Sequence, residues 1–308
     1  MMQTDMAAPD SSLPFPSTLL SAYQRGVAIL QAAEVTNADN EAFWLLEAGL
    51  GVSRLRVYAD PHARVGQADW ARTEALFRRR ASREPLQYIM GTQVFRGRDF
   101  LVNSSVLIPR PETELLIEEV LASHFSTVDC HMVDMGTGSG CLAVSLALDC
   151  PGATVSATDC SAQALQVASE NAQRHGVADR IRFFRGECLE PLAAGAFEGK
   201  VSVIVSNPPY IPSEQCERLP REVQAFEPLP ALDGGSNGLA FYDRLLAESP
   251  SLLHPGGILV MEMGMNQSDA VCRKVGSKKE YVIRTIRRDQ AGIDRVICLE
   301  RTSSSWTV

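Results

Sequence analysis

One stretch of the sequence ends a buried strand in a rigid polar turn, and its residue types suit chemistry on a planar NH2 group. Residues 201–206 form a largely apolar, β-branched run that is typical of a central parallel strand. Asn207 precedes Pro208 and Pro209, so the strand must stop there in an extended conformation. Tyr210 follows with an aromatic face against which a planar group can stack. Ligands of open α/β sheets bind at this end of a strand.

The polar atoms of this turn predict a specific kind of catalysis. The Asn207 side-chain oxygen and the Pro208 carbonyl are two acceptors that can bind both hydrogens of one NH2 group. A conjugated NH2 is a weak nucleophile, and acceptors aimed at its hydrogens offset the positive charge that develops during attack. We therefore expect Asn207, Pro208 and Tyr210 to be catalytic, and Pro209 to complete the substrate site. The alternative is a turn that only ends a strand, since Asn-Pro is a common turn signal.

A glycine-rich loop after an earlier strand predicts a nucleoside site. Its candidate cofactor-binding residues are Asp134, Gly136, Thr137, Gly138, Ser139 and Gly140. The dinucleotide fingerprint requires glycine at position 141, where this chain has Cys141, so no pyrophosphate is expected. The next strand ends in Asp159, and an acidic residue there suits a bidentate bond to both ribose hydroxyls. We expect Asp134 to face a cationic ligand. The alternative for the loop and Asp159 is a glycine turn followed by a helix cap, with no ligand.

Strands and helices alternate in the second part of the chain, which predicts a doubly wound α/β fold with a seven-stranded, Rossmann-like sheet. The expected strands are 132–135, 153–158, 181–184, 201–206, 258–263, 281–286 and 295–299. The last two are expected to form an antiparallel pair.

The first part predicts a small helical bundle joined to the sheet by a β-hairpin. Apolar residues at helical spacing predict four helices between residues 17 and 85, the first of them capped by Ser17. Residues 87–91 and 100–102 look extended on either side of the turn at 96–98, which predicts the hairpin. The expected parts are a disordered tail (1–16), a helical substrate-docking domain (17–85), a hairpin linker (86–108), an α/β domain (109–301) and a second tail (302–308).

Composition limits the possible functions. The chain has 308 residues with 45% hydrophobic and 21% charged content, as in globular proteins. No apolar run reaches the ~18 residues of a membrane span, and the start lacks the basic residues of a targeting peptide, so we expect a cytoplasmic protein. The net charge of −8 argues against sequence-independent nucleic-acid binding. The eight cysteines form no C-x-x-C pair and do not cluster with histidines, so no metal is expected.

The glycine loop, Asp159 and the tetrapeptide 207–210 resemble the motifs of class I S-adenosylmethionine-dependent methyltransferases that act on conjugated NH2 groups. Further segments are similar to the release-factor glutamine N5-methyltransferase family (PrmC/HemK). They are 88–91, 107–114, 226–235, 238–239, 262–264 and 289–296. The resemblance covers about residues 20 to 300, and it assigns 109–301 as the methyltransferase domain.

The resemblance implies an enzyme that transfers a methyl group from S-adenosylmethionine to the glutamine side-chain amide in the Gly-Gly-Gln motif of class-1 peptide chain release factors. It places the cofactor at Asp134, the 136–140 loop, Asp159 and Asn207. Many relatives have Asp and then a bulky apolar or aromatic residue after the third strand. This chain has Glu187 and Cys188 there. We expect the acid to accept from the adenine amino group and the smaller cysteine to stack less.

Two alternatives belong to other functional classes. An N6-adenine methyltransferase acting on DNA or RNA shares the tetrapeptide, but the net charge and the lack of a basic recognition domain argue against it. A non-catalytic cofactor-binding protein disagrees with the intact Asp134, Asp159 and Asn207. We expect a monomer whose partner is a release factor, with no stable nucleic-acid or membrane binding. Residues 227–235 are expected to shape the glutamine entrance, and the arginines at 78–83 form either a solvated face or part of a docking surface.

Overall fold

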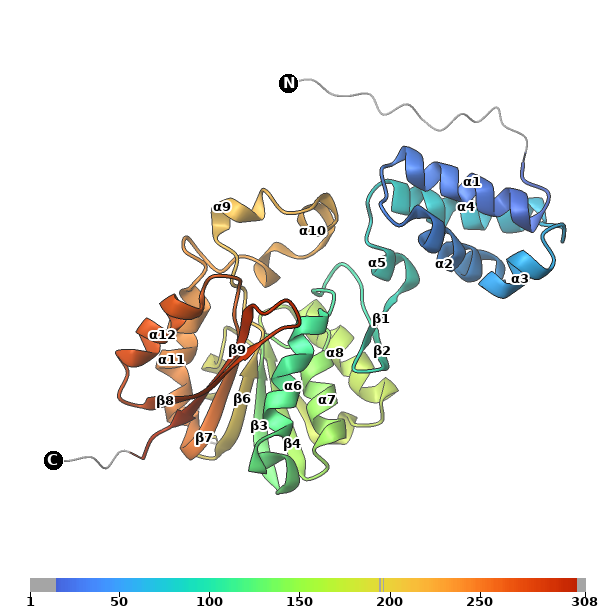
Figure 1. The fold of residues 1–308 in the computed structure, drawn as a ribbon. Helices are drawn as coiled ribbons and strands as arrows, with labels where there is room; N and C mark the ends of the chain where they lie inside the picture. The colour runs from blue at the N-terminus through green and yellow to red at the C-terminus, as the bar shows by residue number, and fades with distance from the viewer. Residues whose placement is uncertain (1–14, 194, 196, 304–308) are drawn as a thin grey trace. The chain divides into compact units, whose positions relative to one another are not determined.

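The structure is a computed structural model that describes residues 15–193, 195 and 197–303. The chain splits into two compact units, Met1–Met90 and Gly91–Val308 (Figure 1). The expected tails lie outside the described residues except for positions 15–16 and 302–303. In the described part, no helix has the length and apolar character that crossing a membrane requires.

The first unit is a bundle of helices packed around one apolar core. Its helices are α1 (Leu19–Ala32), α2 (Ala38–Leu50), α3 (Arg54–Ala59), α4 (Gln67–Ala81) and α5 (Leu86–Met90). Leu30, Trp70 and Phe77 lie in the core. The predicted cap at Ser17 is wrong by one residue, because the Thr18 hydroxyl accepts from the Ser21 amide in a capping box.

The extended segment predicted at residues 87–91 is also wrong. The amides of Tyr88 and Ile89 donate to the carbonyl of Pro85, so a helical turn, α5, starts directly after the proline. A helical turn can bury the side chains of Tyr88 and Ile89 as well as a strand can. The apolar pattern of a five-residue segment therefore does not distinguish a helical turn from a strand. The hairpin itself is confirmed, with β1 (Thr92–Phe95) antiparallel to β2 (Arg98–Leu101).

The arginines at the end of α4 have acidic partners. Arg80 is buried and donates from Nε to Glu41 Oε2 of α2 at 2.6 Å. Arg79 pairs with Glu84 at 2.6 Å, and Arg78 with Glu74 at 3.2 Å. Arg80 therefore fits neither interpretation of this cluster, because its charge ties α2 to α4 inside the bundle.

The second unit is built on a seven-stranded sheet, as predicted. Its strands are β3 (Cys130–Met135), β4 (Ala153–Asp159), β5 (Ile181–Arg185), β6 (Val201–Ser206), β7 (Leu253–Glu262), β8 (Tyr281–Arg288) and β9 (Asp294–Arg301). The order is β5-β4-β3-β6-β7-β9-β8. Neighbouring strands are parallel from β5 to β7 in this order, and β9 is antiparallel to both β7 and β8.

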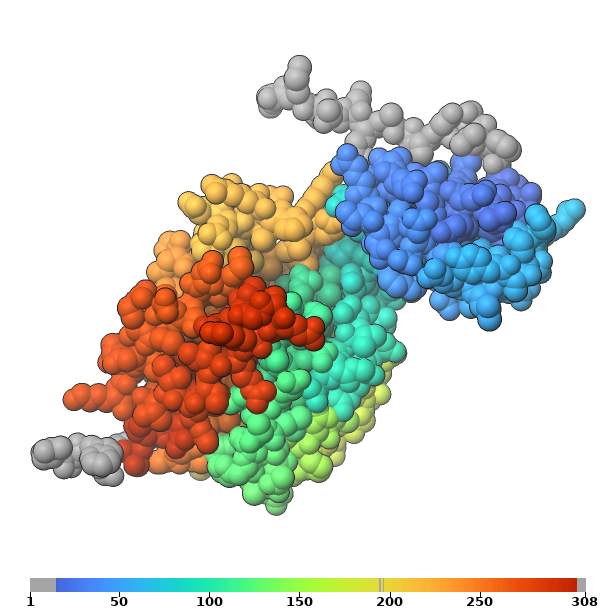
Figure 2. All heavy atoms as spheres, viewed as in Figure 1, coloured from blue at the N-terminus to red at the C-terminus, as the bar shows by residue number. Residues whose placement is uncertain are grey.

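Helices cover both faces of this sheet. The longer ones are α6 (Glu114–Leu121), α7 (Cys141–Asp149), α8 (Ala162–Arg174), α11 (Ala240–Leu252) and α12 (Ser268–Gly276). The short ones are η1 (Pro111–Thr113), η2 (His124–Thr127), η3 (Ala178–Arg180), η4 (Glu190–Leu192), α9 (Ser213–Cys216), α10 (Arg221–Phe226) and η5 (Leu229–Ala231). The segment with α9 and α10, gold in Figure 2, lies at the surface of the unit.

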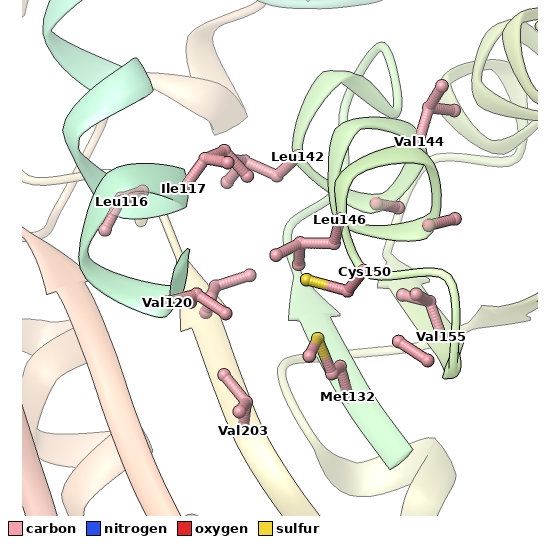
Figure 3. Packing of buried hydrophobic residues seen from close by; sticks show 14 of the residues in the cluster. Leu116, Ile117, Val120, Met132, Leu142, Val144, Leu146, Cys150, Val155 and Val203 are labelled. Carbon is pink, nitrogen blue, oxygen red and sulfur yellow. The ribbon is translucent and has the colours of Figure 1, made fainter. Parts of the chain in front are cut away.

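Alternate residues of each central strand point into two separate cores. Met132 and Val203 pack with Leu116 of α6 and Leu146 of α7 (Figure 3). Their sequence neighbours, such as Val133, pack instead with α11 and α12. Both faces of the central parallel strands are therefore largely apolar, with small polar exceptions such as Ser156 of β4, and acidic residues lie near the strand ends. Because β3 has β4 on one side and β6 on the other, the chain changes direction here, and ligands bind at such a switch point.

Replacing Glu41 with alanine should strongly destabilise the helical unit, because Arg80 would keep its buried charge and lose its carboxylate partner. The expected loss in the free energy of unfolding is about 3–5 kcal/mol, as for breaking one side of a buried ion pair. Urea unfolding of the full chain, followed by the fluorescence of the buried Trp70, measures this loss.

Arg72→Ala is the matched control, since Arg72 pairs with Asp69 at 2.6 Å on the exposed side of α4. Exposed pairs contribute about 0–1 kcal/mol. Equal losses in the two variants would contradict the role given to the buried pair.

Candidate functional site

The glycine-rich loop between β3 and α7 folds against the end of β4. Gly136, Gly138 and Gly140 have φ values of +74°, +54° and +79°, which favour glycine. The amide of Gly136 donates to Thr158 O at 2.9 Å. A Cβ atom at Gly140 would lie 3.0 Å from Ala168, so the loop also packs closely against α8. Conformation thus requires the first two glycines, and close packing adds to the need for the third.

Asp159 ends β4 and connects this loop to α8. Its Oδ2 accepts from the Gly138 amide and its Oδ1 from the Ser161 amide, both at 2.9 Å. The Ser161 side chain caps α8 by accepting from the amide of Ala164. Each carboxylate oxygen has further lone-pair capacity, so Asp159 can still accept from two neighbouring hydroxyls of a ligand.

Asp134 lies beneath the same loop and is fully buried. Its Oδ2 accepts from Thr137 Oγ1 at 2.7 Å and from the Ala143 amide at 3.1 Å, so it joins the loop to the start of α7. Its Oδ1 has no hydrogen-bond partner among the described residues. Burial raises the pKa of this carboxyl to about 7, against the effect of the two hydrogen bonds. The orphaned oxygen leaves an unsatisfied acceptor beneath the loop.

A cavity of about 620 Å³ lies at the carboxyl ends of β3, β4 and β6, within the ~300–1,000 Å³ range of ligand pockets. Of the predicted site residues, its lining includes Gly136, Gly138, Asp159, Glu187, Cys188, Asn207 and Pro209. The predicted residues outside the lining are Asp134, Thr137, Ser139, Gly140, Pro208 and Tyr210. The structure thus brings both sequence motifs to one cavity, and it places Asp134 and Tyr210 behind the wall.

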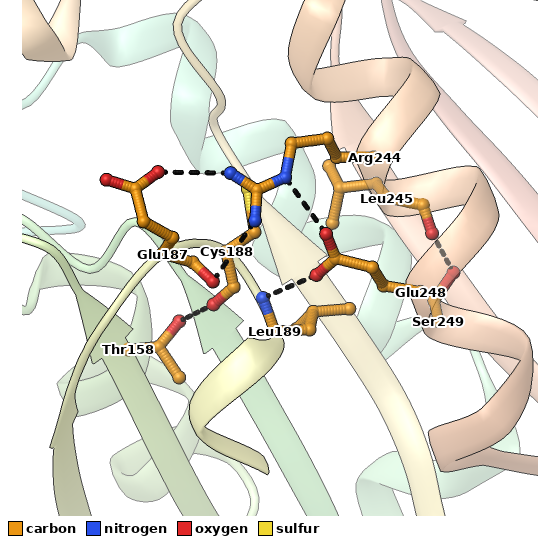
Figure 4. A network of polar contacts seen from close by, with 8 residues as sticks. All are labelled: Thr158, Glu187, Cys188, Leu189, Arg244, Leu245, Glu248 and Ser249. Carbon is orange, nitrogen blue, oxygen red and sulfur yellow. Dashed lines mark hydrogen bonds and ion pairs between the residues drawn. The ribbon is translucent and has the colours of Figure 1, made fainter. Parts of the chain in front are cut away.

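An arginine of α11 holds the segment that carries Glu187 (Figure 4). Arg244 Nη1 donates to Glu187 Oε2 at 3.0 Å, and Arg244 Nε donates to Glu248 Oε1 at 2.9 Å. Glu248 in turn accepts from the Leu189 amide at 3.0 Å. This ion-pair network fixes the wall of the cavity beside β5. One carboxylate oxygen of Glu187, Oε2, accepts from Arg244, so the other oxygen, Oε1, is the one to consider for a ligand.

Cys188 lies in this wall with a left-handed backbone, φ +49°. The Thr158 hydroxyl donates to its carbonyl at 2.8 Å and holds that conformation. Burial raises the pKa of the Cys188 thiol to about 12, so the sulfur stays protonated and is not a nucleophile. Phe241 of α11 also lines the cavity, so an aromatic ring is present there although position 188 lacks one.

The carboxamide of Asn207 belongs to a chain of buried hydrogen bonds. Its Nδ2 donates to Thr113 Oγ1 at 3.0 Å, and Thr113 Oγ1 donates to Glu262 Oε2 at 2.7 Å. The Tyr210 hydroxyl donates to the other oxygen, Glu262 Oε1, at 3.3 Å. Thr113 and Glu262 are 2% and 1% exposed, so this chain is shielded from water. The carboxamide is therefore held from behind, on the side away from the cavity that it lines.

The carboxyl of Glu262 has an unusual environment. Burial raises its pKa to about 7, while the Thr113 hydrogen bond and the charge of Arg295 oppose the shift. Arg295 forms its own ion pair with Asp289 at 3.1 Å.

A second ion pair joins two segments of the cavity rim. Arg110 donates to Glu227, which is buried and also accepts from the Ile108 amide at 3.3 Å. Residues 105–107 and 228–231 lie next to these partners in the sequence, and both segments line the cavity. The expected role of residues 227–235 at the glutamine entrance stays a prediction, although part of this segment lines the cavity.

The sequence analysis missed Thr113, Arg244, Phe241 and the role of Glu262. Glu262 carried a signal, since it is an acid directly after the apolar run of β7, as Asp159 is after β4. Thr113 lies in the segment 107–114 that resembles the family, but the resemblance gave it no role. Arg244 had no signal, because it lies on a helix with an ordinary helical pattern. Over the residues that the structure describes, no group of three His, Cys, Asp or Glu side chains could hold a metal ion.

The geometry can bind a ligand with two neighbouring hydroxyls and a positive charge, and it can present a fixed carboxamide to a second group in the same cavity. Neither task requires a strong base, and the lining contains no histidine. Such a site suits transfer of a group to a planar nitrogen.

Comparison with known proteins agrees with this chemistry. The PrmC N-terminal domain model matches residues 21–91, and the methyltransferase small domain model matches residues 112–220. The release factor glutamine methyltransferase of Geobacter sulfurreducens is 44% identical over 265 residues, which cover 85% of this chain and 89% of the relative. That of Bacillus subtilis is 38% identical over 270 residues, covering 86% and 92%.

Solved structures share the fold at low identity. A methyltransferase from Pyrococcus furiosus aligns with a TM-score of 0.50 and 19% identity, over 73% of this chain and 99% of that one. The hMettl16 catalytic domain aligns with a TM-score of 0.53 and 14% identity, over 76% and 92%. The fold of the second unit is thus that of methyltransferases, and by its sequence the chain belongs to the release factor glutamine methyltransferase family.

Proposed function

We propose that this chain transfers a methyl group from S-adenosylmethionine to the side-chain amide nitrogen (N5) of the glutamine in the Gly-Gly-Gln motif of class-1 peptide chain release factors. The observation that carries the proposal is the position of Asn207, whose oriented carboxamide lines the same cavity as Asp159 and the glycine loop. Family membership supports the choice of substrate.

The residues of the cavity fit the cofactor. We assign both ribose hydroxyls to Asp159, which lines the cavity and can accept further hydrogen bonds. The backbone at Gly136 and Gly138 lets a ligand approach closely because no side chain intervenes. Glu187 and Phe241 form the wall that we assign to adenine. The orphaned Asp134 oxygen lies under the loop and outside the cavity lining, so any effect of Asp134 on a cationic ligand is electrostatic and not a direct contact. When bound, S-adenosylmethionine supplies an electrophilic methyl group.

Asn207 prepares the glutamine nitrogen for attack. Its Oδ1 accepts one hydrogen of the substrate NH2, and we assign the other to the carbonyl of Pro208. Both acceptors gain strength as the nitrogen becomes positive, so they lower the barrier more than they aid binding. The methylated nitrogen then loses its extra proton to water, since an N-protonated amide is strongly acidic. Tyr210 and Pro209 complete the turn that holds these groups.

We propose that the helical unit contributes to binding of the release factor and that the enzyme acts as a monomer in the cytoplasm. The helices α2 and α3 expose large apolar side chains, among them Trp44 (45%), Leu55 (76%) and Tyr58 (61%). Apolar and aromatic side chains are typical anchors of protein interfaces.

Asn207→Ala should lower kcat by about 10²–10³-fold, as loss of one preorganised polar contact does in other enzymes. Affinity for S-adenosylmethionine should fall much less, because Asp159 and the loop are unchanged. Radiolabelled methyl transfer to purified release factor measures both, and a release factor with Gln→Ala in its Gly-Gly-Gln motif serves as the control. A variant with the full single-turnover rate would reduce the tetrapeptide to a strand-ending turn.

Asp159→Ala should weaken S-adenosylmethionine binding about tenfold or more, because a charge-assisted acceptor is lost. Isothermal calorimetry of the folded variant measures the dissociation constant. Asp243→Ala is the matched control, since Asp243 is an exposed acid that pairs with Lys274 at 2.6 Å and does not line the cavity. Equal affinities of wild type and Asp159→Ala would remove this residue from the cofactor site.

Leu55→Ser should raise KM for the whole release factor without changing the affinity for S-adenosylmethionine, because it removes an exposed apolar anchor from the helical unit. Val282→Ser is the control, as Val282 is 50% exposed on β8. Steady-state kinetics with release factor as the varied substrate provide the test. If Leu55→Ser and further substitutions at Trp44 and Tyr58 all leave KM unchanged, this surface has another role.

A further inference from the structure

The hydrogen bonds behind Asn207 have a direction, and Glu262 sets it. An ionised carboxylate has no hydrogen to give, so the single O–H of Thr113 must point to Glu262 Oε2. The Thr113 oxygen can then only accept from Asn207. The carboxamide must therefore offer its NH2 to Thr113, which leaves its oxygen for the cavity that Asn207 lines.

Shape alone cannot make this choice. The two ends of a carboxamide have nearly the same size, so a flipped Asn207 would fit the same space. A flipped side chain would present its NH2 to the NH2 of the substrate, and two donors cannot bond. The hydrogen-bonded chain from Glu262 through Thr113 to Asn207 therefore selects the carboxamide orientation in which the Asn207 oxygen faces the substrate.

We infer that Glu262 is a positioning residue for methyl transfer, which acts through the Thr113 hydroxyl to keep Asn207 Oδ1 facing the substrate nitrogen. The inference rests on the proposed function, since it explains how the acceptor of that reaction is oriented. Glu262 lies at the end of β7 and Thr113 in η1, so two elements outside the tetrapeptide control its chemistry. The Tyr210 hydroxyl bonds the same carboxylate and fixes the other end of the turn.

Protonation of Glu262 should reverse the direction, because a carboxylic acid can donate to Thr113 and free the threonine hydrogen for Asn207 Oδ1. The titratable and charged groups that face Glu262 from the elements around it are Arg295 on β9, Glu112 on η1, Tyr210, Tyr242 on α11 and Cys141 on α7. Burial raises the pKa of both tyrosines and of the cysteine, so these three stay protonated near neutrality. Glu262, with a pKa of about 7, changes charge there.

The test compares Glu262→Gln and Thr113→Val with the conservative Thr113→Ser. The first two should lower kcat about tenfold or more and leave KM for S-adenosylmethionine within about twofold, because they disturb only the orientation of the acceptor. Thr113→Ser keeps the hydroxyl and should restore most of the rate. Folding is checked by circular dichroism, and Thr113→Val carries the test if Glu262→Gln does not fold.

A second carboxylate–threonine pair, made of a buried acid and an exposed threonine, supplies controls elsewhere in the sheet domain. Glu119 of α6 is 7% exposed and accepts from the Thr285 hydroxyl at 2.6 Å, and neither residue lines the cavity. Glu119→Gln and Thr285→Val should leave kcat unchanged. The inference is overturned if wild type methylates the release factor and both Glu262→Gln and Thr113→Val keep kcat within about twofold of it. An inactive wild type would instead overturn the proposed function.

The pH profile separates positioning from a merely structural role. For wild type, kcat should rise as the pH increases through about 7, where Glu262 becomes ionised. Glu262→Gln cannot ionise, so its kcat should be low and flat over this range. Asp134 also has a pKa of about 7, and an unchanged rise in Glu262→Gln would assign the titration to Asp134 and overturn the inferred role of Glu262.

Discussion

A buried carboxylate can only accept hydrogen bonds, and this constraint determines the arrangement of both halves of the site. Asp134 is the penultimate residue of β3 and Glu262 is the last residue of β7, and burial raises the pKa of each to about 7. Each takes the hydroxyl hydrogen of a threonine, Thr137 for the first and Thr113 for the second. The first bond fixes the glycine-rich loop, and the second fixes Asn207. Two acids that never line the cavity thus position the groups that do.

Ion pairs place the remaining walls. Arg110 with Glu227 joins the two rim segments, and Arg244 with Glu187 holds the wall beside β5. The Arg244 and Glu187 side chains are 36% and 61% exposed, and exposed pairs contribute little to stability. Their value lies in geometry, since each pair ties together loop or helix segments that the apolar cores do not reach. The cores on both faces of the sheet provide the rigid base for these segments.

The sheet and the main site residues could be predicted because their signals are local. Each predicted polar group directly follows an apolar strand, and the carboxyl ends of parallel strands meet at one edge of a sheet. Asn207, Asp159 and the glycine loop therefore lie together at the cavity. The error at residues 87–91 has the opposite cause. A five-residue segment that buries Tyr88 and Ile89 is compatible with both a strand and a helical turn. The hydrogen bonds from the amides of Tyr88 and Ile89 to the Pro85 carbonyl form the helical turn.

The sequence by itself determined the family, the α/β sheet and the residues of two motifs that meet at one cavity. It did so because residue type and order along a strand are local properties. Only the tertiary structure decided how these residues are oriented. Thr113 is 94 positions from Asn207 and 149 from Glu262, and no local pattern links them. The direction of a hydrogen bond depends on which donors and acceptors folding brings together, and burial is the largest cause that raises the pKa of Glu262.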